Sequence, residues 1–376
     1  MNVLFLTSSY PVPDLPALGV FVREHALAVS RHADVAVAHI ERSDDVRWIH
    51  AEHGSDPQFP SVRVRYPSSP AVVSYASNVG AAMLAYRRLR AAGFEPDLIH
   101  AHFFLAGAPA IALGRLWRKP VVITEQWSVF LPDDPMTLTR PMQRVARFAF
   151  EHADMVMPVS EALRDGIRAI GADADFRVVP NVVDTDRFHP NGAPPSSGTR
   201  RLIGVGNLYE AKGWDVLLDA VAILRDRDRD LRLDLYGGGV LQQQLESQVA
   251  RLGLEGLVAF HGWRTKDEVA AELRRSDVFV IASRYDSNPC AVIEALASGV
   301  PVVGTAVGGI PEMVTDGMGT LVGPERPEEL AAAIESALDR DWDRGRIAAQ
   351  AKDRFGSERI GRDFAAVYAD ALRKPR

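Results

Sequence analysis

The segment Ser283–Pro301, with the sequence SRYDSNPCAVIEALASGVP, indicates the fold class of this chain. It follows the apolar run 277–282, DVFVIA, which is typical of a buried β-strand. After a polar turn, residues 290–298 form an apolar stretch of helical length that Gly299 is well placed to end. The run 300–303 then opens another strand, so the segment predicts the strand–helix–strand unit of a parallel α/β sheet.

Glu294 is the only charged residue in the predicted helix, which is otherwise apolar and should therefore be buried. A buried carboxylate is stable only when it is paired or hydrogen-bonded, so we expect a polar group opposite Glu294. Asp286 precedes it with seven residues between them, and the free amides at the helix start can hold an anion. Two carboxylates beside an amide cluster indicate a phosphate-containing ligand that also carries hydroxyls. The alternative is a core helix whose Glu294 bonds a neighbouring loop.

Length and composition limit the class of protein. A chain of 376 residues is too long for one typical domain, and 47% hydrophobic with 24% charged residues is typical of a soluble globular protein. The net charge of −6 argues against nucleic acid as a partner. The single cysteine, Cys290, fits a reducing compartment, and we see neither a basic leader nor an apolar stretch of membrane-spanning length. We expect a cytoplasmic protein, with peripheral contact at the inner membrane face as an open alternative.

Strand and helix patterns alternate along both halves of the chain. In the first half we predict strands at 3–6, 35–40, 62–66, 98–99, 121–124 and 155–159, and helices at 19–32, 105–117 and 137–152. In the second half we predict further strands at 202–206, 231–236 and 257–260, and helices at 213–228, 240–252, 327–338, 342–354 and 357–372. Residues 44–60 show no clear period and are predicted to be irregular. Proline, glycine and serine crowd residues 189–200, HPNGAPPSSGTR, as in a linker.

We therefore predict an α/β protein with two doubly wound parallel-sheet domains, 1–190 and 201–356, joined by a linker at 191–200. Sheets of this kind bind ligands outside the carboxyl ends of their strands, and clefts between domains are favoured binding places. We expect the ligand in an interdomain cleft, at the loops that follow the strands.

Two loops of the second half offer ligand contacts. Lys212, beside glycines and just before a helix, could meet a phosphate as a point charge, or be a solvated loop lysine. Gly237 and Gly238 let a backbone approach a ligand closely, although a tight turn would need them equally. The dinucleotide fingerprint, GxGxxG followed by an acid about twenty residues later, is missing, which disfavours a dehydrogenase.

The first half carries polar side chains at two predicted strand ends. His100 and His102 differ by two positions, so both point to one face of the sheet if the strand continues. A metal pair lacks a further ligand at suitable spacing, so a hydroxyl-binding role for His102 is favoured. Glu125, Gln126 and Trp127 follow the next strand and offer an acid, an amide and a ring that could contact a sugar.

These segments together resemble the glycosyltransferase family 4 group (glycosyl transferases group 1), retaining enzymes of the GT-B fold. The resemblance covers nearly the whole chain, and the order and spacing of its motifs are specific although each motif alone is weak. They are the loop with Gly19 and the segments 98–102, 156–160, 179–188, 204–213, 236–239 and 286–294. The resemblance implies two Rossmann-like domains, an acceptor-binding one at 1–190 and a nucleotide-sugar-binding one at 201–356. It also implies that a final helix at 357–376 packs back on the first domain.

The resemblance implies a role for each residue that matches the family's motifs. Glu294 would bind the ribose hydroxyls of the donor, Asp286 the donor sugar and Lys212 the diphosphate. His102 would lie beside the donor sugar and complete the catalytic set, and the Gly19 amide would approach the phosphate and the acceptor. Further donor contacts are implied for Asn207, Gly237, Gly238, Trp263, Arg264, Asn288, Cys290 and Ala291, and acceptor-side contacts for Glu125 and Gln126.

Four positions depart from the family's pattern. Asp286 stands where glutamate is usual, Pro289 where glycine is common, Asn207 where arginine is frequent, and Gln126 where a histidine often stands. The shorter side chain of Asp286 reaches less far, and Pro289 lacks an N–H donor. These changes leave the implied site in place but make the specificity for the donor sugar hard to transfer.

The implied reaction moves a sugar from a nucleoside diphosphate sugar to a hydroxyl of a glycan, a lipid-linked or a small-molecule acceptor. Configuration would be retained, and neither a metal nor another cofactor would be needed. A sugar-nucleotide epimerase of similar two-domain shape would require acid and base side chains that we do not find. A non-catalytic sugar-nucleotide-binding protein is the third alternative.

Two groups of arginines recur at helical spacing in the first half, Arg87, Arg88 and Arg90 in one and Arg140, Arg144 and Arg147 in the other. A basic amphipathic face can bind anionic lipid, which would suit a lipid-linked acceptor. A solvated helix surface is the simpler interpretation. The slight acidity of residues 1–190, with 19 Lys+Arg against 21 Asp+Glu, favours that simpler interpretation.

Overall fold

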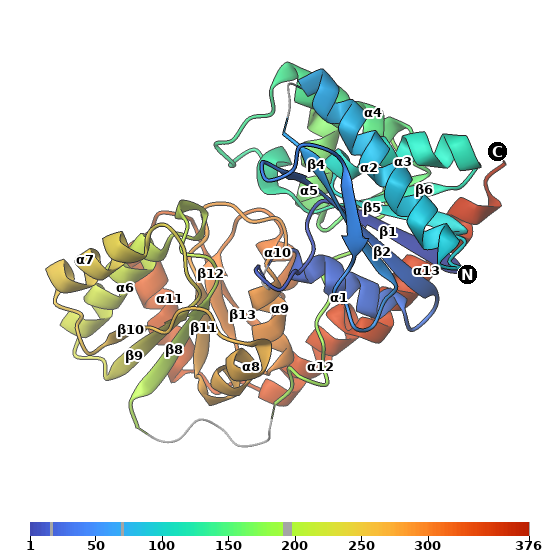
Figure 1. Ribbon diagram of the computed structural model, residues 1–376. Helices are drawn as coiled ribbons and strands as arrows, with labels where there is room; N and C mark the ends of the chain where they lie inside the picture. The colour runs from blue at the N-terminus through green and yellow to red at the C-terminus, as the bar shows by residue number, and fades with distance from the viewer. Residues whose placement is uncertain (16–17, 69–70, 191–197, 376) are drawn as a thin grey trace. The chain divides into compact units, whose positions relative to one another are not determined.

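The computed structural model describes residues 1–375 except 16–17, 69–70 and 191–197. The chain divides into two compact units (Figure 1). Unit 1 comprises Met1–Phe130, Met136–Val182 and Ser357–Arg376, and unit 2 comprises Leu131–Pro135 and Val183–Gly356. The division therefore falls after Val182, ahead of the predicted boundary at 190. Most of the predicted linker at 191–200 lies outside the described residues.

Unit 1 contains a seven-stranded sheet in the order β3-β4-β2-β1-β5-β6-β7. The strands are β1 (Asn2–Thr7), β2 (Asp34–Ser43), β3 (His50–His53), β4 (Ser61–Pro67), β5 (Leu98–His102), β6 (Val121–Glu125) and β7 (Met155–Pro158). β3 runs antiparallel to β4, and the other neighbouring strands are parallel.

The prediction that residues 44–60 are irregular is wrong at β3. Its sequence, HAEH, has no apolar face and so gives no strand signal. Charge pairs hold it at the sheet edge instead, because Glu52 lies 3.5 Å from Arg63 and 3.8 Å from Arg65 of β4. Cross-strand pairs of this kind depend on the partner strand, which a local pattern does not reveal.

Helices cover both faces of the unit 1 sheet. They are α1 (Val20–Val29), α2 (Ala71–Ala91), α3 (Phe104–Trp117), α4 (Arg140–Glu151), α5 (Glu161–Ala169) and α13 (Ser357–Arg373), with a short 3₁₀ turn at Ser128–Phe130. The crossovers from β4 to β7 run opposite to the crossover from β1 to β2, so right-handedness places α2, α3 and α4 on the face away from α1. α1 packs against α13, and α3 packs against both α2 and α4 (Figure 1).

The core of unit 1 includes side chains from the last helix of the chain. Ile360, Phe364, Val367 and Tyr368 of α13 are fully buried in one cluster with residues of β1, α1 and β2. Each such side chain contributes about 1.5–3 kcal/mol when it is fully buried. α13 is therefore part of the amino-terminal unit although residues 183–356 separate it from the rest in sequence.

Unit 2 contains a six-stranded parallel sheet in the order β10-β9-β8-β11-β12-β13. The strands are β8 (Arg200–Val205), β9 (Leu231–Tyr236), β10 (Val258–Phe260), β11 (Val278–Ile281), β12 (Val302–Thr305) and β13 (Gly319–Val322). The helices are α6 (Trp214–Asp226), α7 (Gln242–Leu252), α8 (Lys266–Arg275), α9 (Cys290–Ala297), α10 (Ile310–Met313), α11 (Pro327–Asp339) and α12 (Arg344–Phe355), with a 3₁₀ turn at Glu210–Lys212. The sequence predictions omit α8, α10 and β13, which are short or strongly charged segments.

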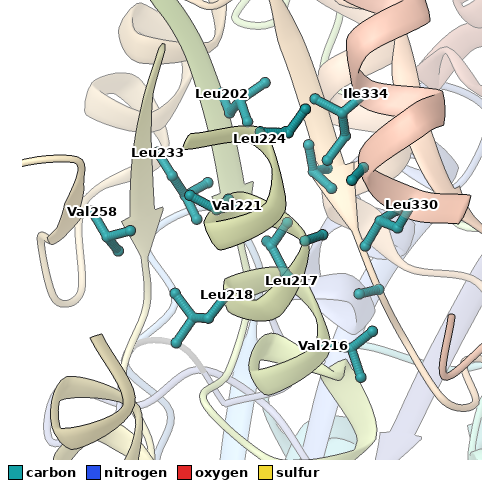
Figure 2. Close-up of a cluster of buried hydrophobic side chains, with 14 of the residues drawn as sticks. Leu202, Val216, Leu217, Leu218, Val221, Leu224, Leu233, Val258, Leu330 and Ile334 are labelled. Carbon is teal, nitrogen blue, oxygen red and sulfur yellow. The ribbon is translucent and has the colours of Figure 1, made fainter. Parts of the chain in front are cut away.

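One face of the unit 2 sheet packs against α6 and α11. Figure 2 shows Leu217, Val221 and Leu224 of α6 beside Leu330 and Ile334 of α11. These side chains rest on Leu202 and Leu233, which point from β8 and β9. The tight packing fixes the strands of a parallel sheet in register, so their carboxyl ends and the loops that follow lie along one edge. Over the residues that the structure describes, no helix has both the length and the apolar character needed to cross a bilayer.

Candidate functional site

Three loops meet at the carboxyl edge of the unit 2 sheet, after β8, β9 and β11. Gly237 after β9 has φ 130, and a Cβ at this position would overlap the carbonyl oxygen of Gly206 after β8. Gly213 has φ 58, and its Cβ would overlap the carbonyl oxygen of Ala282 after β11. Such positions admit only glycine without strain. The glycines therefore let the three loops pack directly against one another.

Lys212 and Asp286, predicted from separate motifs, form an ion pair at this edge. The hydroxyl of Ser283 also lies 3.4 Å from the same carboxylate oxygen of Asp286. The Asp286 side chain is 10% exposed and that of Lys212 is 22% exposed. A pair with this little exposure is less screened than a surface pair and holds both side chains in defined positions.

Glu294 is buried in α9, as the sequence predicts, and has a cationic partner. The ammonium of Lys266 lies 3.2 Å from one carboxylate oxygen of Glu294. The prediction that a polar group lies opposite Glu294 is thus confirmed. The identity of that group was missed because α8, KDEVAAELRR, shows little apolar periodicity. The signal that could have found it is the capping box of Thr265 and Glu268, which marks the start of α8.

The start of α9 lies at the same edge, because the helix begins directly after the β11 loop. Pro289 is its N-cap residue, Cys290 is half-buried, and the preceding Asn288 is 4% exposed. Cys290 and Ala291 are the first residues of the helix, where backbone amides are not used by the helix itself. The structure therefore places these three predicted residues beside the pair of Lys212 and Asp286.

The loop after β10 adds an exposed ring to this edge. The Trp263 side chain is 58% exposed, and a Cβ on Gly238 would lie 2.7 Å from its indole nitrogen. Arg264 is exposed beside it, with its guanidinium 3.3 Å from the Trp263 carbonyl. Asn207 is exposed after β8, and its carbonyl accepts a hydrogen bond from the Trp214 indole at 2.8 Å. The predicted donor contacts of unit 2 thus belong to neighbouring loops.

Arg284 anchors the turn that carries Lys212, and no sequence motif marks it. Its backbone N–H donates to the Ala211 carbonyl at 2.8 Å, and its guanidinium donates to the Glu210 carbonyl at 2.7 Å. The guanidinium also binds both carboxylate oxygens of Asp215, at 3.0 and 2.7 Å. The hydrogen bond to Asp215 raises the pKa of Arg284. A single arginine after a strand gives no sequence signal for this role.

His102 lies at the end of β5 in unit 1 and is fully buried. Its ring stacks on His100 with 4.4 Å between centroids and lies 5.6 Å from His25 of α1. Neither ring nitrogen of His102 has a hydrogen-bond partner among the described residues. Burial lowers the pKa of His102 well below its usual value, and His100 and His25 lower it further. His102 is therefore a neutral imidazole.

Glu125 is also fully buried, but both of its oxygens serve the backbone. One accepts the Phe104 N–H at 2.8 Å, and the other accepts the Gln126 and Trp127 N–H groups at 3.0 and 2.9 Å. Burial raises the pKa of Glu125 to about 7, and these three hydrogen bonds act in the opposite direction. The side chain organises the β6 loop and the start of α3. These amides use three of the roughly four acceptor positions of the carboxylate, and the sugar contact of Glu125 stays a prediction.

Gln126 and Gly19 are the remaining predicted residues of unit 1. Gln126 is 8% exposed, and its amide nitrogen lies 3.4 Å from His25. Gly19 precedes α1 with φ 61, and a Cβ there would overlap the carbonyl oxygen of Ser9. Gly19 thus permits a close turn between the β1 loop and α1, which directs the first amides of α1 to the carboxyl edge of the unit 1 sheet.

Two family descriptions match the chain and together span most of it. The family described as Glycosyltransferase Family 4 matches residues 29–187, and that described as Glycosyl transferases group 1 matches residues 187–354. The chain is 31% identical over 303 residues to a D-inositol 3-phosphate glycosyltransferase of Corynebacterium aurimucosum, covering 73% of this chain and 72% of the relative. It is 27% identical to a glycogen synthase of Mycobacterium tuberculosis, covering 100% of this chain and 96% of the relative.

Solved structures with low sequence identity share the fold. Anabaena HepE in complex with UDP has a TM-score of 0.76 at 20% identity, covering 98% of this chain and 100% of that chain. The sucrose-phosphate synthase of Thermosynechococcus elongatus has a TM-score of 0.75 at 20% identity, with 98% of each chain covered. At these identities the likeness describes the arrangement of strands and helices within the units.

Proposed function

This chain belongs to the glycosyltransferases of family 4 and group 1, and from this premise we propose that it is a retaining enzyme that uses a nucleoside diphosphate sugar. It is a glycosyltransferase with the two Rossmann-like units of the GT-B fold. The observation that carries the proposal is the ion pair of Lys212 and Asp286 at the carboxyl edge of the unit 2 sheet, next to the start of α9, the helix that carries Glu294. A cation and two carboxylates match a ligand that combines phosphate with several hydroxyls.

The donor would be held by chemically distinct parts of this edge. Glu294 would accept hydrogen bonds from the ribose hydroxyls, and the first amides of α9 with Lys212 would bind the diphosphate. Asp286 would accept a hydroxyl of the donor sugar. The HepE structures with UDP and UDP-glucose show that a chain of this fold holds such a nucleotide, and we propose the same ligand class here.

The ion pair of Lys212 and Asp286 would rearrange when the donor binds. A diphosphate presents more negative charge than one carboxylate, so it would draw Lys212 away from Asp286. Asp286 would then be free to accept a hydroxyl of the donor sugar. The ligand-free pair thus keeps both side chains close to the places where the donor needs them.

The proposed reaction needs stabilisation of the leaving group above all. The bond between the anomeric carbon and the diphosphate oxygen breaks, and its electron pair goes to the diphosphate, whose charge Lys212 and the α9 amides would stabilise. The acceptor oxygen bonds to the same face of the anomeric carbon, and its proton goes to the departing phosphate. Lys212 would supply a cation beside the leaving diphosphate. We therefore propose a metal-independent transfer, which chelation with EDTA should leave unchanged.

The acceptor is proposed to be a hydroxyl of a carbohydrate, a small molecule or a lipid-linked glycan. The two curated relatives carry names that refer to different acceptors, inositol 3-phosphate and glycogen. A hydroxyl-bearing acceptor is common to both names, and it is the class that we assign. Competition between myo-inositol 3-phosphate, short maltooligosaccharides and a lipid-linked glycan in one assay would separate the three.

One face of unit 1 supports a peripheral membrane contact. The sequences of α2 and α3 contain no acidic residue, and α4 contains only Glu151. Nine basic residues lie on these helices and the turn after α3, namely Arg87, Arg88, Arg90, Arg115, Arg118, Lys119, Arg140, Arg144 and Arg147. Among these nine basic residues, Arg90 and Lys119 pair with Glu95, and Arg147 pairs with Glu151. Basic charge is thus gathered on one face of a unit that is slightly acidic in total, which favours an anionic lipid surface.

Vesicle sedimentation tests this contact. We expect binding to vesicles with 30% phosphatidylglycerol and not to pure phosphatidylcholine, with loss of binding when Arg87, Arg88 and Arg90 are changed to alanine. The same change at Arg359 and Arg362, exposed on α13 at the opposite face, is the control. Equal binding by both variants would show that the basic face does not contact lipid.

A thermal-shift panel tests the donor assignment. UDP-, GDP-, ADP- and dTDP-glucose are added to the wild type, to Glu294→Gln and to Glu328→Gln, an exposed control on α11. One nucleotide at 100 times its Kd should stabilise the wild type and the control by about 2.7 kcal/mol, and the Glu294 variant far less. Absence of any shift in the wild type, together with no transfer product, would refute the proposed function.

A further inference from the structure

The ion pair of Lys266 and Glu294 joins two helices of the candidate donor site. We propose that Lys266 is a positioning residue that holds Glu294 ready to accept the ribose hydroxyls of the donor. The inference rests on the proposed function, since it assumes that Glu294 binds a nucleotide. It adds a residue that sets donor affinity without touching the reacting atoms.

Glu294 needs such a partner because of its surroundings. Its neighbours in α9, Ile293 and Ala295, are fully buried, and the Glu294 side chain itself is only 10% exposed. A carboxylate with this little access to water is unfavourable unless opposite charge and hydrogen bonds compensate. Lys266 supplies opposite charge at 3.2 Å.

Lys266 is held rigidly at the first position of α8. Thr265 caps the helix, because its hydroxyl accepts the Glu268 N–H at 3.3 Å while the Glu268 carboxylate accepts the Thr265 N–H at 2.8 Å. Asp267 is bound by Arg187 at 2.8 Å, and Glu272 is bound by Arg201 of β8 at 2.9 Å. These contacts fix the position of the start of α8, and so fix the backbone from which the Lys266 side chain extends.

The pairing leaves Glu294 able to bind hydroxyls. An ionised carboxylate has two oxygens with about four acceptor positions, and the ammonium of a lysine occupies one of them. Lys266 lies 3.2 Å from one of the two oxygens of Glu294, and one such contact does not use all the acceptor positions of a carboxylate. The contact therefore orients the carboxylate and does not block it.

Lys266 also links two protein segments that are proposed to contact the donor, the loop before α8 and helix α9. Trp263 and Arg264 come just before Thr265 and are proposed donor contacts, and Glu294 is the proposed ribose contact. Since Lys266 follows this loop directly, the contact to Glu294 fixes the loop and the carboxylate relative to each other. Loss of Lys266 should loosen nucleotide binding more than it slows the chemical step.

The experiment compares Lys266→Met, Lys266→Arg and Lys352→Met, an exposed lysine of α12 that serves as the matched control. The probe is the nucleoside diphosphate glucose that stabilises the wild type most in the four-nucleotide panel. We expect donor KM for Lys266→Met to rise about tenfold, which corresponds to about 1.4 kcal/mol, with kcat within twofold of the wild type. Lys266→Arg should recover most of the affinity, and Lys352→Met should change neither constant.

A double-mutant cycle with Glu294→Gln gives the second readout. If Lys266 acts through Glu294, adding Lys266→Met to Glu294→Gln should raise donor KM by less than twofold. A full tenfold increase on top of Glu294→Gln, or an unchanged KM in Lys266→Met alone, would overturn the inference. Lys266→Gln serves in the same cycle should the Met variant fail to fold. Failure of the proposed function is distinct, because the wild type would then bind none of the four nucleotides.

Discussion

Acidification should selectively destabilise unit 1, because its core contains buried neutral histidines. His25, His100 and His102 are fully buried, and burial lowers the pKa of His25 to about 3 and that of the other two well below 6.5. The unfolded chain takes up protons on these rings below about pH 6.5, whereas the folded chain does not. The stability that the neutral rings maintain is therefore fully present above pH 6.5 and is lost as the pH falls.

The magnitude follows from the number of rings. Each ring contributes up to about 1.4 kcal/mol per pH unit once the pH is well below 6.5, and about 1 kcal/mol between pH 6.5 and 5.5, where the unfolded ring is only partly protonated at the start. Three rings therefore lower the free energy of unfolding by about 3 kcal/mol over that range. Glu125, whose pKa burial raises to about 7, binds a proton in the folded chain and offsets about 1 kcal/mol of this loss. For His25 alone the loss levels off near its folded pKa of about 3, at about 5 kcal/mol in total. His39 of β2, whose pKa is also lowered by burial, adds to the same slope. A domain of ordinary stability, about 5–15 kcal/mol, would lose much of it by pH 5.

Hydrogen exchange measured by mass spectrometry at pH 7.5, 6.5 and 5.5, after correction for intrinsic rates, reports the two units separately. We expect protection of β1, β5 and α13 to fall steeply with pH, and that of β8 and β11 to fall less. His102→Gln removes one titrating ring and should reduce the stability loss of unit 1 between pH 6.5 and 5.5 by about 1 kcal/mol. His53→Gln, at an exposed position of β3, should leave that loss unchanged. A flat response of unit 1, or equal slopes for His102→Gln and wild type, would refute the reasoning.

Three further substitutions probe contacts described above. Gly213→Ala should lower the free energy of unfolding by at least 2 kcal/mol in urea titration, because φ is 58 and the new methyl overlaps the Ala282 carbonyl; a neutral result would contradict the backbone geometry. Tyr368→Phe removes the 2.7 Å hydrogen bond to His100 and should destabilise unit 1 by about 1 kcal/mol in the same titration, and an unchanged midpoint would argue against that bond. Lys212→Met should lower kcat at least a hundredfold in a product assay while Lys352→Met retains full activity; near-normal turnover would exclude Lys212 from leaving-group stabilisation.

The parts of the fold that the sequence predicts are those whose pattern is local. Buried strands such as β1 and β11 are continuous apolar runs, and α6 and α9 have the length and composition of packed helices. β3 and α8 were missed because charge pairs and caps stabilise them, and those partners come from other elements. The boundary between the units was placed too late because residues 183–190 contain no break in composition that reveals their contacts with unit 2.

The residues of the candidate site also fall into those that the sequence predicts and those that only the structure reveals. Asp286, Glu294 and Lys212 stand out because each is a charge in a setting that disfavours charge or favours anions. Lys266 and Arg284 do not, because a lysine opening a charged helix and an arginine in a loop are ordinary in sequence. Their roles come from contacts made across the sheet edge. Glu125 also has a role that the sequence does not reveal, because its carboxylate accepts three backbone amides from the β6 loop and the start of α3.

The place of α13 in unit 1 has a consequence for biosynthesis. The ribosome synthesises α13 only after residues 183–356. Until then, the nascent amino-terminal part of unit 1 lacks Phe364 and Tyr368, which belong to its core. During that interval the side of its sheet next to α1 presents apolar surface that is covered in the finished protein. Unit 2 is nearly contiguous in the chain, because all of it except Leu131–Pro135 lies within residues 183–356, and it can form its own core first. Maturation therefore runs against the direction of synthesis, and the earliest residues to be translated are among the last to reach their final packing.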